Sequence, residues 1–129
     1  MARKFTAEEK AAAKAALKDA EGEKAVLAAI AKMAKADREI AERIHGIVRQ
    51  VAPELTPRTW YGMPAYSKDD KVVVFFRDAG KFKERYSMLG FNDTANLDSG
   101  SMWPIAYALP KLTKADEAKI RKLVKQGVS

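Results

Sequence analysis

The hydrophobic pattern of this chain changes its period once, near Pro57, and that change limits the possible folds more than any other feature. Before Pro57, apolar residues recur at the three- to four-residue spacing of helices. After it, short aromatic and β-branched runs alternate with turn signals at 62–64, 68–70 and 78–80. Since tight turns join antiparallel strands and a last helical pattern follows, the sequence predicts an α+β fold of two layers, an antiparallel sheet with helices packed on one face.

The first helical segments are marked by a capping signal. Thr6 and Glu9 have the spacing of a capping box, in which each side chain accepts a hydrogen bond from the other residue's backbone amide. A helix is therefore predicted over residues 7–20. Gly22 is expected to end it, because glycine is common just after a helix. A second helical stretch is expected at 26–33.

The next helix has the clearest apolar stripe. Asp37 is expected to cap this helix and Pro53 to end it. Thr113, with Asp116 three residues later, predicts the start of a final helix. The apolar positions of the third helix fall on one side and should face the core: Ile40, Ile44, Ile47, Val48 and Val51.

The segment between Pro57 and the last helix is predicted to form a meander of short strands. A polar loop at 90–101 separates the last two strands, and it is long for a connection without structure of its own. The expected strands lie near residues 59–61, 65–67, 71–77, 82–89 and 103–109.

Alternation along two of these strands sorts their residues between the faces of the sheet. Val72, Val74 and Phe76 are expected to face the helices, as are Phe82, Tyr86 and Met88. The sheet face away from the helices, the open face, is then expected to hold Phe75, Arg77, Lys83 and Arg85. Cations beside an exposed aromatic ring can hold a phosphate, a carboxylate or a stacked base. An ordinary polar surface, or a patch covered by a second copy of the chain, are the alternatives.

Large side chains gather around the turn at 62–64, and most of them are expected in the core. Together with the polar loop they are also candidates for the wall of a ligand pocket. These residues are Trp60, Tyr61, Met63, Tyr66 and Trp103.

The composition excludes several kinds of chemistry. The chain has no cysteine, which removes disulfides, thiolate metal sites and cysteine nucleophiles. Its one histidine, His45, lies beside the apolar stripe of the third helix, without a nucleophile motif, and is expected at the core margin. The net charge is +7, and residues 111–129, with 6 cations and 2 anions, supply +4 of it. That excess favours anionic partners, or a solvated helix face.

The loop at 90–101 collects oxygen ligands, including Asp93, Asn96 and Asp98. The spacing does not match a calcium loop of EF-hand type, which needs glycine at its sixth place and glutamate at its twelfth. Side chains of this type usually hydrogen-bond their own backbone. An irregular metal site at these three residues is therefore the minor interpretation.

The segment Trp60–Tyr66, which reads WYGMPAY, follows an Ala-Pro-Glu sequence at 52–54. This combination resembles the YdhG-like family, a family of unknown function, and the resemblance extends over roughly residues 37–124. It implies a two-layer α+β fold related to secretion-chaperone-like domains. Some members of the family carry an iron-chaperone label, which implies metal handling, although the acids of this chain are scattered and its charge is basic.

Taken together, residues 1–129 are predicted to form one domain, with 1–35 as an N-terminal helical arm. The predicted function is non-catalytic binding of an anionic small ligand or of nucleic acid, and metal (iron) handling or a chaperone-like role is the alternative. We expect no cofactor, no membrane partner, and a monomer or weak homodimer. The basic pair at residues 3 and 4 has no apolar run behind it, which predicts no signal peptide and a cytoplasmic location.

Overall fold

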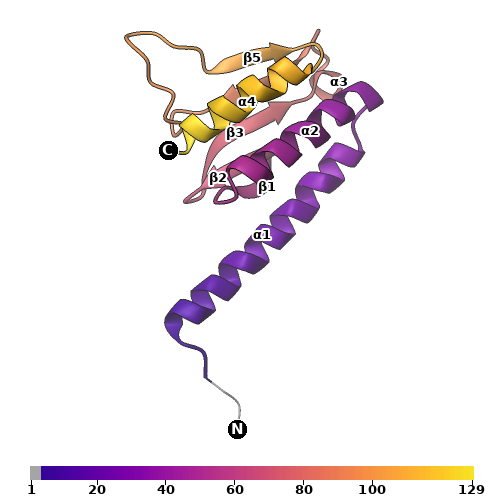
Figure 1. The fold of residues 1–129 in the computed structure, drawn as a ribbon. Coiled ribbons are helices and arrows are strands. Elements are labelled where there is room, and N and C mark those ends of the chain that lie inside the picture. The colour runs from indigo at the N-terminus through magenta and orange to yellow at the C-terminus, as the bar shows by residue number, and fades with distance from the viewer. Residues whose placement is uncertain (1–3) are drawn as a thin grey trace.

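A computed structural model describes residues 4–129 of the chain (Figure 1). Residues 1–3 of the expected arm lie outside the described residues. The elements follow one another as α1 (Ala7–Ala31), α2 (Lys35–Val51), β1 (Thr56–Trp60), β2 (Met63–Lys68), β3 (Lys71–Arg77), α3 (Ala79–Phe82), β4 (Ser87–Phe91), β5 (Ala106–Leu109) and α4 (Lys114–Gly127).

Within the described residues, the strands form one sheet in the order β1-β2-β3-β4-β5, and every neighbouring pair is antiparallel. The long helices α1, α2 and α4 lie on the same side of this sheet (Figure 1). The expected α+β class, with helices on one face of an antiparallel sheet, is therefore confirmed. In the described part of the chain, no helix is long and apolar enough to cross a membrane.

The core lies between the sheet and the helices. The predicted stripe of α2 supplies much of it, since Ile40, Ile44, Ile47 and Val48 are all buried there. Val74, Phe76 and Leu89 come to the same core from the sheet, and Ile120 and Val124 come from α4. Each fully buried aliphatic or aromatic side chain stabilises the fold by about 1.5–3 kcal/mol.

The first helix is longer than predicted, because α1 runs without a break through Gly22 to Ala31. Gly22 lies against β1, where a Cβ atom would stand 1.8 Å from the carbonyl oxygen of Pro57. The close approach of two backbones explains the glycine, so the prediction of a helix end there was wrong. Val26 and Ile30 are buried, whereas most residues of the N-terminal half of α1 are exposed, and this half of the helix extends beyond the sheet (Figure 1).

The start of α2 also differs from the prediction. The helix begins at Lys35, before the expected cap at Asp37. The carboxylate of Asp37 instead accepts hydrogen bonds from the Ser87 hydroxyl, at 3.1 Å, and from the Gly80 amide, at 3.0 Å. Asp37 thus connects α2 to the segment around α3, which a local capping pattern does not reveal.

The segment predicted as a strand over 82–89 is largely not a strand. Asp78 accepts a hydrogen bond from the Lys81 amide and caps the short helix α3, and Lys83 ends that helix with a φ of 53°. The strand β4 begins only at Ser87. Since 78–80 was interpreted as a turn, the cap was missed. The other strands shift by a few residues, to 56–60, 63–68 and 106–109, while 71–77 is confirmed.

A bulge in β3 changes which residues share a face. Tyr66 pairs with Val74 but the next residue, Ser67, pairs with Val72, so Val73 is the extra residue. Val73 and Val74 both join the core, whereas Val72 lines a groove on the open face with Trp60. The predicted grouping of Val72 with Val74 was therefore wrong, because strict alternation fails at a bulge.

Candidate functional site

The strand register builds one continuous row of residues across the open face. Arg58, Ala65, Phe75, Gly90 and Ala106 are successive partners from β1 to β5. The neighbours of Phe75 in this row are small, and its ring covers the Gly90 backbone so closely that a Cβ there would lie 2.2 Å from the Phe75 Cζ. The register thus places Phe75 on the open face, and α1, α2 and α4 lie on the other side of the sheet (Figure 1).

Three aromatic residues meet at this place and form what we call the aromatic platform: Trp60, Tyr61 and Phe75. The rings of Trp60 and Phe75 are 5.2 Å apart at their centroids and meet edge to face, at 63°. Tyr61 lies 5.0 Å from Trp60 and is 76% exposed. Trp60 and Phe75 are partly exposed. The platform therefore offers aromatic surface to solvent.

A shallow groove of about 250 Å³ runs beside Trp60. Arg58 and Lys71 line it, together with the acids Asp70 and Asp93. Asp70 is engaged by Lys18, whose hydrogen bond and charge lower the pKa of this carboxyl group, with a smaller contribution from Arg58. The groove therefore keeps two exposed cations at its edge, while one of its acids is already paired.

The expected cations on the open face are only partly where the sequence placed them. Arg77 is on this face, opposite Met88, but its guanidinium pairs with Glu84 and lies 3.8 Å from the Phe82 ring centroid. Lys83 ends α3, and Arg85 lies in the exposed connection to β4. Placing these last two residues on an open-face strand was wrong, because the strand begins after them.

The remaining members of the predicted pocket wall are divided between the two faces. Met63 is buried opposite Trp60, at the start of β2. Tyr66 lies on the helix side of the sheet and is fully buried in the core. Trp103 packs against that core from the loop before β5. The structure thus brings Trp60, Tyr61, Met63 and Phe75 to one face and separates the others from them.

The predicted metal loop forms no cluster of side chains. Asn96 is tied to the C-terminal end of the chain, where its amide donates to the Ser129 carbonyl oxygen at 3.1 Å. Asp93 and Asp98 are exposed. Among residues 4–129, no group of three or more histidine, aspartate or glutamate side chains could hold a metal ion. The metal interpretation stays an untested prediction.

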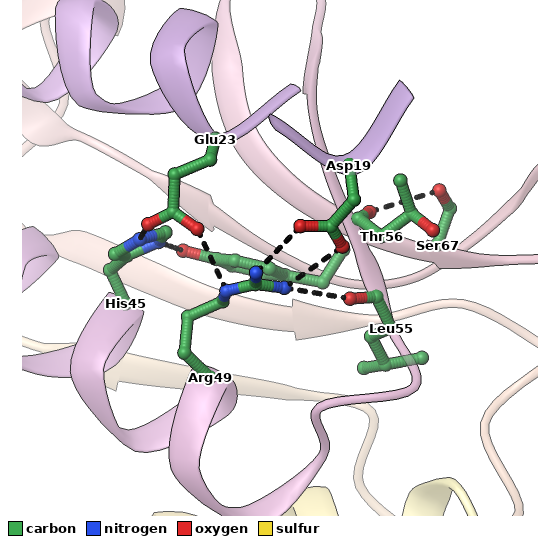
Figure 2. Close-up of polar contacts among 8 residues, drawn as sticks. Asp19, Glu23, His45, Arg49, Leu55, Thr56 and Ser67 are labelled. Carbon is green, nitrogen blue, oxygen red and sulfur yellow. Dashed lines mark hydrogen bonds and ion pairs between the residues drawn. The ribbon is translucent and has the colours of Figure 1, made fainter. Parts of the chain in front are cut away.

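A polar cluster that the sequence did not predict lies between α1, α2 and β2, and Figure 2 shows its contacts. We define the polar cluster as Asp19, Glu23, His45, Arg49 and Tyr66. Glu23 stands between two partners, with one oxygen 2.5 Å from His45 Nε2 and the other 2.9 Å from Arg49 Nε. Arg49 also donates to both oxygens of Asp19, at 2.7 and 3.2 Å. His45 Nδ1 shares a hydrogen bond of 2.8 Å with the Tyr66 hydroxyl.

The polar cluster has a structural role, which is to hold α1 and α2 against the sheet. Burial, and then the charge of Glu23, raise the pKa of the Tyr66 hydroxyl, so this phenol stays neutral at ordinary pH. Tyr66 is 0% exposed and His45 is 7% exposed, which leaves a substrate no path to the pair. The hydrogen bonds instead satisfy buried polar groups and fix α1 and α2 relative to the sheet.

A sequence signal for the polar cluster does exist. Asp19 and Glu23 are four residues apart on one helix, and His45 and Arg49 are four residues apart on the next. Residues at this spacing share a helix face, so an acidic pair and a basic pair on neighbouring helices indicate a contact between them.

Comparison of the chain with protein-family models, with curated proteins and with solved structures returns no match. The geometry of the open face and of the polar cluster therefore carries the functional interpretation by itself.

Proposed function

We propose that this chain is a non-catalytic binding domain whose open face holds a nucleobase together with its phosphate, as in single-stranded nucleic acid or a free nucleotide. One observation carries the proposal. Trp60 and Phe75 present partly exposed rings, 5.2 Å apart, on the side of the sheet away from the helices, with Arg58 and Lys71 beside them.

The aromatic platform supports base stacking for two reasons. Every nucleobase has a π-face, and stacking on an aromatic side chain contributes about 1–3 kcal/mol per base. Ala65 and Gly90, the partners of Phe75 in its row, are small and are themselves buried, so the ring of Phe75 rather than the strand around it is the stacking surface. Tyr61, at the edge of the platform, extends the surface for a second base.

Phosphate binding is assigned to the groove beside Trp60, where Arg58 and Lys71 are exposed. These cations lie within the reach of a phosphate whose base stacks on the platform. Residues 111–129 carry a large excess of positive charge. They form α4 and the short segments beside it, on the helix side of the sheet (Figure 1). Attraction of nucleic acid by α4 is therefore non-specific, and only the contribution of the open face to the binding affinity should depend on base stacking.

Membership in the YdhG-like family is part of the same proposal, and its support is the WYGMPAY segment, which supplies two residues of the platform, Trp60 and Tyr61, and the β1–β2 turn. A cytoplasmic location is proposed on the absence of cysteine from the chain.

Tryptophan fluorescence tests the proposal. In a Trp103→Phe background, Trp60 is the one remaining tryptophan and reports directly from the platform. A short oligothymidine should quench it, and thymidine monophosphate should quench it with lower affinity if extended single strands are the natural ligand. Equal affinity for both would identify the free nucleotide as the ligand class.

Two variants and one control separate stacking from charge. Phe75→Ala should weaken binding by roughly 5- to 150-fold, the loss of about 1–3 kcal/mol of stacking. Arg58→Ala with Lys71→Ala should reduce the slope of log affinity against log salt by about 1.4, since each phosphate contact on a single strand contributes about 0.7. The control, Lys122→Ala with Lys125→Ala, removes the same charge from exposed positions of α4. If this control weakens binding as much as the open-face pair, the assignment to the open face is wrong.

A further inference from the structure

The two edges of the sheet differ in what lies beside them. At the first edge, α1 packs against β1, and Gly22 lies directly against the Pro57 carbonyl group. At the other edge, β5 pairs with β4 alone among the strands of residues 4–129, and it is the outermost strand at the top of Figure 1. Ala106 and Ala108 of this strand are exposed. In the described part of the chain, the sheet therefore has a free edge at β5.

The pairing of β5 with β4 decides which backbone groups point to this free edge. The Phe91 amide donates to the Ile105 carbonyl oxygen at 2.7 Å, so residue 105 forms its backbone hydrogen bond with β4. The direction of bonding alternates along an antiparallel strand. The N–H and C=O groups of Ala106 and Ala108 therefore point away from β4. Unpaired groups of this kind are a template for a further strand.

The sequence of the edge has the same pattern of residue types in both directions. Residues 104–110 read PIAYALP, with Tyr107 at the centre. Two copies that pair antiparallel about Tyr107 therefore place like residues opposite one another. The pairs are Ala106 with Ala108 of the second copy, Ile105 with Leu109 of the second copy, and Pro104 with Pro110 of the second copy.

The two prolines favour a second copy over an unrelated strand. Pro104 and Pro110 occupy the next outward-bonding positions on either side of the alanines, and neither has an N–H group. A longer strand of another protein would place carbonyl oxygens opposite these missing donors. In the self-pairing register the prolines face each other, so neither copy brings an N–H donor that loses its partner.

The distribution of charge favours the same contact. The chain carries a net charge of +7, so two copies repel each other over much of their surfaces. Residues 99–110 contain no charged side chain, and this is the longest such run in the sequence. Ile105 is 51% exposed, and a second copy at the edge would cover part of this apolar surface.

We propose that two copies of this chain pair through their β5 edges, antiparallel and about a twofold axis at Tyr107. Ala106 and Ala108 of each copy exchange backbone hydrogen bonds with the same residues of the other, which joins the two sheets. Since α1 lies against β1, association stops at the dimer. The paired segment is short, so the dimer is weak and forms as the protein concentration approaches about 1 mM. This surface does not depend on the proposed nucleobase site.

Sedimentation equilibrium over a range of about 10 µM to 1 mM protein tests for the dimer. An isotope-filtered NOE experiment on mixed labelled and unlabelled protein tests the register. It should show a contact between the α-hydrogens of Ile105 and Leu109, which face each other across the proposed pair. Within one copy these residues are about 13 Å apart along the strand, so the contact must be intermolecular. A monomer mass throughout, or a dimer without this contact, would overturn the proposal.

The salt dependence gives a second test. The Lys119 ammonium lies 5.1 Å from the Tyr107 ring centroid, so the proposed axis brings two positively charged α4 helices toward each other. Dimerisation should therefore strengthen as salt screens this repulsion, whereas attraction of nucleic acid weakens with salt. A dimer that weakens with salt would contradict this geometry.

Ala108→Pro is the informative variant, because it removes an outward N–H group and leaves the bonds between β5 and β4 in place. It should weaken dimerisation by at least about tenfold, since each copy loses a hydrogen bond. Ile105→Lys should have a similar effect by placing a cation in the contact, and it changes only an exposed side chain. The control, Leu17→Lys, adds the same charge at a 60% exposed position of α1 and should leave the dimer unchanged. Dimerisation unaffected by Ala108→Pro and Ile105→Lys, or weakened equally by the control, would show that β5 is not the interface.

Discussion

Gly22→Ala is a substitution for which helix propensity and tertiary structure predict opposite results. In the interior of a helix, alanine is favoured over glycine by about 1 kcal/mol. Gly22 lies in the interior of α1, so propensity alone predicts a more stable protein. The structure predicts the reverse, because the added Cβ would stand 1.8 Å from the Pro57 carbonyl oxygen and 2.9 Å from its carbonyl carbon.

The size of the effect follows from that distance. Real Cβ atoms essentially never approach another atom within 3.0 Å, so α1 must move away from β1 by at least 1.2 Å, the difference between 3.0 and 1.8 Å. The obstacle is backbone and has no rotamer to change. Overpacking costs about 1–3 kcal/mol, and a backbone obstacle places Gly22→Ala near the upper value. After subtraction of about 1 kcal/mol for propensity, the net loss is about 2 kcal/mol, or roughly 8 °C in Tm for a domain of this size.

The chain offers a matched control. Gly46 is an exposed glycine inside α2, and a Cβ there would meet nothing within 4 Å. Gly46→Ala should therefore raise the free energy of unfolding by about 1 kcal/mol. Urea unfolding of the two variants beside the wild type measures both changes. Stabilisation by Gly22→Ala comparable to that by Gly46→Ala would refute the close packing of α1 against β1.

Other predictions concern the polar cluster and the cap of α4. Because burial raises the pKa of Tyr66, absorbance titration at alkaline pH should show that the Tyr66 phenol stays neutral in the folded protein at a pH where it ionises in the unfolded chain, and the free energy of unfolding should fall above about pH 10, where the unfolded phenol ionises first. His45→Ala leaves the Tyr66 hydroxyl without its partner and should cost about 2–3 kcal/mol in urea unfolding; adding Tyr66→Phe should recover part of that loss. Hydrogen bonds from the backbone amide and then the hydroxyl of Thr113 lower the pKa of Asp116. The contribution of this carboxylate to stability is therefore complete above its unfolded pKa and is lost as the pH falls through the lowered pKa. The stability difference between the wild type and Asp116→Asn should therefore shrink below about pH 4, and a constant difference would contradict the cap.

Features that depend only on residues close together in the sequence could be predicted from it. The capping box of Thr6 and Glu9 and that of Thr113 and Asp116 are both present, because a cap involves residues only three positions apart. The stripe of α2 is buried as expected, because a period of 3.6 residues defines a helix face without reference to the rest of the chain.

Features that depend on contacts between distant residues could not be predicted in the same way. The sequence around Gly22 has the local signature of a helix end, and only the Pro57 carbonyl oxygen, brought close by folding, explains the glycine inside α1. The bulge that directs the Val73 side chain toward the core depends on the register between β2 and β3. His45 was expected at the core margin, but its partners Glu23 and Tyr66 are 22 and 21 residues away.

In the candidate site, too, some residue positions could be predicted from local sequence and others could not. Phe75 was placed on the open face correctly, because β3 alternates regularly from Val74 onward. Lys83 and Arg85 were misplaced, because the Asp78 cap starts a helix where alternation suggested a strand. Arg58 and Lys71 were not singled out, since their position beside Trp60 depends on the pairing of β1, β2 and β3.

The most direct test of the nucleobase site is an amide NMR titration with a short single-stranded oligonucleotide, first at low salt and then at physiological salt. The proposed function predicts shifts at Arg58, Trp60, Phe75 and Gly90 that persist at the higher salt, because stacking on the platform is not screened. Shifts confined to α4 that disappear at the higher salt would contradict it, because they would show that the chain attracts nucleic acid only through the non-specific charge of residues 111–129.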